Sequence, residues 1–81
     1  MNEPYRIIWH HTAINRNDHQ FLAIDASHKA LGFPVSALGY YVGYHYLIEH
    51  DGFVKRARLD FEIGAHDAGE NEGSIGVALA G

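Results

Sequence analysis

Apolar, β-prone side chains concentrate near the start of the chain and predict a strand over residues 5–12. Successive side chains of a strand point to opposite faces, so His10 and His11 are expected on opposite sides of it. Residues 18–31 instead carry apolar side chains at helical spacing, which predicts a helix with one face packed on a sheet. The expected packing face consists of Phe21, Ile24, His28 and Leu31.

The limits of this helix are indicated by local signals. Asn17 followed by Gln20 resembles a capping box. In a capping box, two side chains accept hydrogen bonds from backbone N–H groups that the start of a helix leaves unpaired. Gly32 and Pro34 are residues that end helices. Residues 33–43 are rich in glycine, proline, aromatic and small residues, and they are expected to form a connecting loop.

The second half of the chain predicts more strands. Residues 44–50 and 53–58 are β-prone runs around Asp51-Gly52, a strong hairpin signal, and Lys55, Arg56 and Arg58 are expected on its solvated face. Residues 64–73 are predicted to form an exposed loop, and the apolar run 74–80 is typical of a buried strand. The predicted fold is therefore a small mixed α/β domain over residues 1–81, with a helix packed on the sheet.

Composition and charge narrow the classes of function. The 81 residues contain no cysteine, so disulfides are excluded as the support that so short a chain commonly needs, and a metal or a partner chain remains. The net charge of −4 without a basic run disfavours nucleic acid as a partner. The N-terminus lacks the pattern of a secretory signal, and no apolar run is long enough to span a membrane.

Seven histidines in so short a chain suggest metal binding without locating a site. From the pattern alone, His10 at the end of a strand and His66 in the polar loop are candidate ligands, but structural or solvated roles are the more common outcome for such residues. Tyr44 is a packing residue on the same grounds. The chain has no compact ligand spacing such as CxxC or HExxH.

Three motifs in a fixed order resemble one protein family. They are IIWHHTA at residues 7–13, VGYHYLIEHDG at residues 42–52 and IGAHDAGENEGSIGVALAG at residues 63–81. Together they resemble the front two-thirds of zinc-dependent N-acetylmuramoyl-L-alanine amidases, the family of small phage lysins and peptidoglycan recognition proteins. The resemblance implies a fold of the amidase/peptidoglycan-recognition type that lacks the C-terminal third.

The resemblance also implies a site and a reaction. His10 matches a zinc-binding histidine, Tyr44 matches the catalytic tyrosine beside the metal-bound water, and His66 and Asn71 match positions that line the muramyl-peptide groove. The implied reaction is hydrolysis of the amide between the lactyl group of N-acetylmuramic acid and L-alanine in peptidoglycan. Zinc would polarise the carbonyl and activate water, and Tyr44 would orient that water or stabilise the oxyanion.

The zinc site implied by the resemblance is incomplete in this chain. The family's second histidine ligand, its third ligand and its catalytic lysine or threonine follow the strand that here ends at Gly81. Strand alternation is expected to turn His45 away from Tyr44 and the site, which leaves His66 as the remaining candidate for a substitute ligand. Gly73 stands where many relatives have a polar residue, which changes part of the groove.

Two alternatives to an amidase stay open. The first is a zinc-free module that binds peptidoglycan or muramyl peptide, and the second is an assembly protein. In the second case the strand ending near Gly81 would expose an edge that pairs with another chain, as in a homo-oligomer that covers it. The missing signal sequence is consistent with a cytoplasmic protein or with a lysin released to the cell wall by another factor.

Overall fold

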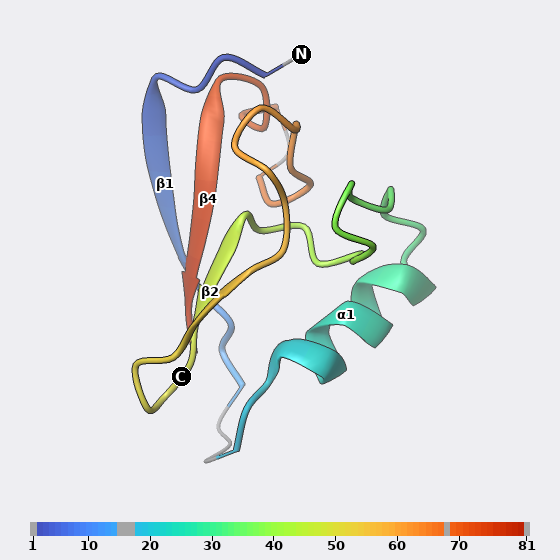
Figure 1. The fold of residues 1–81 in the computed structure, drawn as a ribbon, viewed down its shortest axis with the longest axis vertical. Helices are drawn as coiled ribbons and strands as arrows, with labels where there is room; N and C mark the ends of the chain where they lie inside the picture. Colours follow the sequence, from blue (N-terminus) through green and yellow to red (C-terminus); the bar gives the residue numbers. More distant parts are fainter. Residues whose placement is uncertain (1, 15–17, 68, 81) are drawn as a thin grey trace.

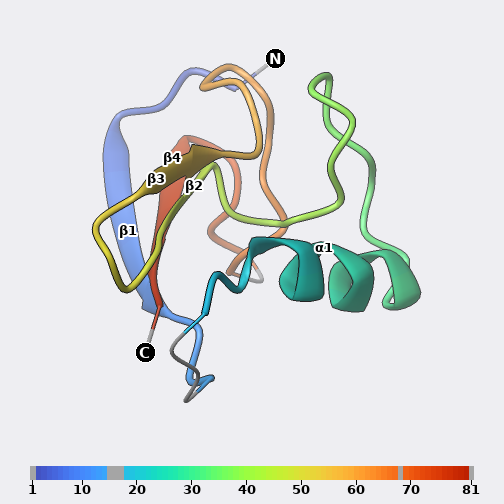
Figure 2. The same cartoon turned by 60° about the horizontal axis from the view of Figure 1, so that its bottom comes forward.

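The computed structural model describes residues 2–14, 18–67 and 69–80. Its elements follow the predicted order of strand, helix, hairpin and strand, as Figure 1 and Figure 2 show together. In chain order they are β1 (Arg6–His11), α1 (Phe21–Ala30), β2 (Tyr46–Ile48), β3 (Val54–Arg56) and β4 (Ser74–Leu79). The predicted fold class, a small mixed sheet with one helix, is confirmed.

The last strand lies inside the sheet. The strand order is β1-β4-β2-β3, in which β4 runs parallel to both of its neighbours and β2 runs antiparallel to β3. Both edges of β4 are therefore paired within the chain. The prediction that the strand near Gly81 has an open edge for another copy of the chain is wrong, because β1 and β2 occupy the two edges.

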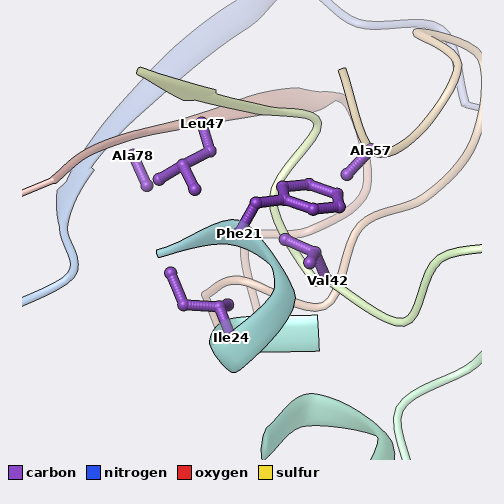
Figure 3. Close-up of a cluster of buried hydrophobic side chains, with 6 residues drawn as sticks. All are labelled: Phe21, Ile24, Val42, Leu47, Ala57 and Ala78. Carbon is purple, nitrogen blue, oxygen red and sulfur yellow. The ribbon is translucent and has the colours of Figure 1, made fainter. Parts of the chain in front are cut away.

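The core lies between α1 and one face of the sheet (Figure 2). Figure 3 shows Phe21 and Ile24 of the helix beside Leu47 of β2 and Ala78 of β4. Val42 and Ala57, which lie outside the regular elements, complete this buried cluster. Leu31 was expected on the same helical face but is 68% exposed, because α1 ends at Ala30.

The start of α1 is held by a residue from another element. Gln20 occupies the N-cap position without a capping bond from its own side chain, and Asn17 of the predicted capping box lies outside the described residues. The buried carboxylate of Glu49, just after β2, accepts hydrogen bonds from the backbone N–H groups of Gln20 at 2.8 Å and of Phe21 at 3.1 Å. This carboxylate satisfies donors that a helix leaves unpaired at its start.

The predicted hairpin is confirmed, with a loop one residue longer than Asp51-Gly52 alone. The backbone N–H of Glu49 donates to the carbonyl of Phe53 at 2.8 Å, so His50, Asp51 and Gly52 form the loop. Gly52 has φ of +86°, the left-handed conformation that glycine adopts at low cost in three-residue hairpin loops.

Arg58 was predicted to be solvated with the other cations of the hairpin, but it is 2% exposed. Its Nε donates to the carbonyl of Val42 at 2.9 Å, and its Nη2 donates to the carbonyl of Pro34 at 2.6 Å. The guanidinium thereby ties the loop after α1 to the segment after β3. A buried cation is tolerated here because its donors are paired with carbonyl oxygens.

The two faces of β1 differ in exposure. Ile7 and Trp9 are 58% and 62% exposed, whereas His10 lies on the other, partly buried face. The predicted separation of His10 and His11 onto opposite faces is confirmed by the alternating burial along the strand. Within the described ranges, no helix has the length and apolarity of a membrane span.

Candidate functional site

Three segments that are far apart in the sequence bring His10, Tyr44 and His66 together. The rings of His10 and His66 have centroids 5.0 Å apart, and Nε2 of His10 lies 2.9 Å from Nδ1 of His66. The ring of Tyr44 lies 5.4 Å from that of His10. His10 comes from β1, Tyr44 from the segment just before β2, and His66 from the loop before β4. The three residues that the motifs single out thus form one cluster.

The imidazole of His66 occupies a narrow slot between two glycines. A Cβ on Gly64 would lie 2.6 Å from Cδ2 of His66, and a Cβ on Gly76 would lie 2.6 Å from its Cγ. At the far end of the ring, Nε2 lies 3.1 Å from the hydroxyl of Ser74, which is fully buried. Any side chain larger than hydrogen at either glycine would displace the ring, so its orientation is fixed by the backbone.

Asn71 supports the loop that carries His66. Its side-chain oxygen accepts hydrogen bonds from the backbone N–H groups of His66 at 2.9 Å and of Asp67 at 2.8 Å. Asn71 also lines an open groove of about 320 Å³ beside His66, together with Phe33, Ala65 and Asp67. His66 and Asn71 therefore line the same groove, and Asn71 also holds the loop that carries His66. That this groove receives a muramyl peptide stays a prediction.

His28 of α1, which was predicted to be a packing residue, is a neighbour of the site. Its Nδ1 accepts a hydrogen bond from the backbone N–H of Gly43 at 2.8 Å, and its ring lies 5.7 Å from Tyr44 and 4.6 Å from Phe33. The helix thereby supports the segment that carries Tyr44. The helical spacing of His28 with Phe21 and Ile24 placed it on the inner face, but no sequence signal separated support of the site from packing.

His45 lies beside His66 rather than away from the site, which corrects the expectation from strand alternation. The two rings have centroids 5.9 Å apart. Nδ1 of His45 accepts from the backbone N–H of Gly76 at 3.0 Å, and Nε2 donates to the carbonyl of Glu62 at 2.7 Å. Alternation does not apply because β2 begins at Tyr46, after both Tyr44 and His45.

Burial controls the charge of these side chains. It lowers the pKa of His66 to about 4, with His10 and His45 contributing in the same direction. Burial also lowers the pKa of His28 and of His45, and it raises the pKa of Tyr44. Near neutral pH the imidazole of His66 is therefore uncharged, and the phenol of Tyr44 keeps its proton. Such groups can bind a metal ion and donate a hydrogen bond to an oxygen atom.

The donors present supply part of a metal site. Zinc in proteins is held by three or four ligands, and a catalytic site keeps one position for water. Among the described residues, no group of three or more histidine, cysteine or acidic side chains is arranged to hold a metal ion. His10 and His66 are joined to each other by a hydrogen bond. The described residues therefore do not complete a zinc site.

Part of the chain is similar in sequence to phage endolysins. No protein-family model matches the chain. Over 40 residues, 49% of this chain and 26% of the relative, it is 48% identical to the endolysin of Escherichia phage T7. Over the same length it is 45% identical to the endolysin of Klebsiella phage KP32.

A solved structure covers nearly the whole chain. The N-acetylmuramoyl-L-alanine amidase LysC from Clostridium intestinale matches 99% of this chain with 32% identity and a TM-score of 0.80, and the match spans 48% of LysC. The fold is thus that of about half of an amidase. More particularly, the chain is a partial match to T7-type endolysins and to N-acetylmuramoyl-L-alanine amidases.

Proposed function

We propose that residues 1–81 form the part of an N-acetylmuramoyl-L-alanine amidase domain that supplies one zinc ligand and one side of the substrate groove. The match to LysC over 99% of the chain at 32% identity carries this proposal. The meeting of His10, Tyr44 and His66 supports it independently, because these residues come from three separate motifs. The substrate would be peptidoglycan or a soluble muramyl peptide.

Each residue of the cluster has a role in this proposal. His10 is the zinc ligand, since a neutral imidazole is a common ligand of this metal. Tyr44, whose pKa is raised by burial, keeps its proton and donates a hydrogen bond to the oxygen on which negative charge develops. His66 and Asn71 line the groove that would receive the peptide stem. Zinc, when bound, supplies a Lewis acid and a water of lowered pKa.

The remaining zinc ligands are proposed to lie outside these 81 residues, in a counterpart of the half of LysC that this chain does not match. By this account the 81-residue chain alone binds zinc weakly and does not hydrolyse peptidoglycan. The alternative, a module that binds muramyl peptide without hydrolysis, uses the same groove. The two functions differ in whether a complete domain cleaves the bond.

A graft separates these functions. Residues 1–81 replace the matching part of LysC, and the product is incubated with purified peptidoglycan and zinc. We expect release of peptides that begin with free L-alanine, identified by mass spectrometry. A graft that folds by circular dichroism and binds muramyl peptide, yet releases no such peptide, would support the binding module and contradict the amidase. The isolated 81-residue chain is the negative control.

A further inference from the structure

We propose that His66 is a positioning residue for His10, which directs the lone pair of His10 Nδ1 toward a metal ion. In this arrangement Ser74 fixes the proton of His66 on Nε2, and Nδ1 of His66 accepts the Nε2–H of His10. The inference rests on the proposed function for the identity of the ion. The direction of the hydrogen bonds is a property of the chain itself.

The direction of these hydrogen bonds is set by Ser74. Its hydroxyl oxygen lies 2.8 Å from the carbonyl of Glu70 and 2.9 Å from the carbonyl of Asn71. Carbonyl oxygens only accept hydrogen bonds, so the single hydroxyl proton points toward them. The lone pairs of the same oxygen then face Nε2 of His66, 3.1 Å away. Nε2 of His66 is therefore the donor in this contact.

The position of the proton on His66 in turn determines the position of the proton on His10. A neutral imidazole carries one N–H, so a proton on Nε2 leaves Nδ1 of His66 as an acceptor. The partner at 2.9 Å is Nε2 of His10, which must donate. In neutral His10 the proton thus resides on Nε2, and Nδ1 has the free lone pair that a metal requires. Partners of this kind commonly set the tautomer and ring orientation of metal-binding histidines.

The backbone prevents His66 from leaving this arrangement. Gly64 and Gly76 enclose its ring on two sides, with space too small for a Cβ at either position. The side chain of Asn71 holds the backbone N–H of His66 at 2.9 Å. Because both the ring and its backbone are held, the acceptor Nδ1 stays directed at His10 before any metal binds. The function of the two glycines is then to define the position of a hydrogen-bond acceptor.

Nitrogen NMR on the metal-free, ¹⁵N-labelled 81-residue chain at pH 7.5 tests the proposal. We expect a coupling across the hydrogen bond between Nε2 of His10 and Nδ1 of His66, with the proton on His10. Nδ1 of His10 should show the chemical shift of an unprotonated ring nitrogen. A proton on Nδ1 of His10, or on Nδ1 of His66, would overturn the proposal.

Variants of Ser74 test the origin of the direction. In Ser74→Ala, Nε2 of His66 loses its acceptor, so its proton can move to Nδ1 and donate to His10. We expect the signal of His10 Nδ1 to shift toward that of a protonated nitrogen. Ser74→Thr keeps the hydroxyl and should restore the original shift, and Ser27→Ala on the exposed face of α1 is the control. An unchanged His10 signal in folded Ser74→Ala would contradict the role of Ser74.

The wild-type measurement does not depend on the folding of any variant. It also separates this inference from the proposed function. A chain with the expected tautomers whose LysC graft is inactive would contradict the amidase and retain the positioning role. An active graft, together with the opposite tautomers in the chain, would support the amidase and contradict the positioning role.

Discussion

The backbone of Gly76 in β4 lies directly against the imidazole of His66, such that a Cβ on Gly76 would approach Cγ of His66 to 2.6 Å. Gly76 also donates its backbone N–H to Nδ1 of His45 at 3.0 Å. A central strand of the sheet therefore sets the position of two histidines at the candidate site. The site is built into the sheet rather than carried by loops alone.

Gly76→Ala should displace His66, because the added methyl group has no room beside the ring. We expect a loss of about 1–3 kcal/mol in the free energy of unfolding, the usual cost of overpacking, together with loss of the nitrogen coupling between His66 and His10. Urea unfolding and NMR measure the two effects. Gly39→Ala is the control, since its methyl group enters open space and tests only the cost of φ at +89°. Unchanged His66 signals in Gly76→Ala would contradict the claim that Gly76 fixes the position of the His66 ring.

Glu49→Ala should destabilise the domain by unpairing the start of α1. The carboxylate of Glu49 is buried and accepts from the backbone of Gln20 and Phe21. Loss of a buried, charge-assisted hydrogen bond costs about 1.5–3 kcal/mol, whereas Glu72→Ala at an exposed position should change stability by less than about 0.5 kcal/mol. Chemical denaturation of the two variants tests this, and equal effects would show that Glu49 does not cap the helix.

The contribution of the buried histidines to stability should fall as the pH drops below about 6.5, the ordinary pKa of histidine. Burial lowers the pKa of His45 in the folded chain, so the unfolded chain binds more protons between the lowered and the ordinary value. The stabilisation is present in full above the ordinary pKa and is lost as pH falls through this window. His28 and His66 act in the same direction.

Urea unfolding between pH 7.5 and pH 5 measures this dependence. His45→Gln removes one titrating group and should make the slope against pH shallower, while the same change at the exposed His50 is the matched control. A slope in His45→Gln as steep as that of the parent chain would mean that His45 titrates alike in the folded and unfolded states.

Local patterns were sufficient to predict the elements but not their arrangement. The hairpin follows from Asp51-Gly52, and β4 from its apolar run, because both signals lie within a few residues. The central place of β4 depends on pairing with β1, at the other end of the chain. An apolar run cannot specify which strands will flank it, so the predicted open edge near Gly81 was wrong.

The motifs predicted which residues of the candidate site meet, but not how every neighbour is placed. His10, Tyr44 and His66 meet as the motif order implied, whereas His45 was placed by an alternation rule that does not hold before β2 begins. Arg58 was expected in solvent because its carbonyl partners, Val42 and Pro34, belong to a loop far from it in the sequence. Contacts of this kind depend on the tertiary fold.

The most direct test of the amidase proposal compares His10→Ala with His11→Ala in the LysC graft. The two histidines are adjacent on β1, but His10 faces the cluster and His11 is exposed on the opposite face. The measured quantity is the zinc-dependent release of peptides with free N-terminal L-alanine from peptidoglycan. The account predicts that His10→Ala abolishes release and that His11→Ala retains it. Equal release by the two folded variants would contradict His10 as a zinc ligand of an amidase.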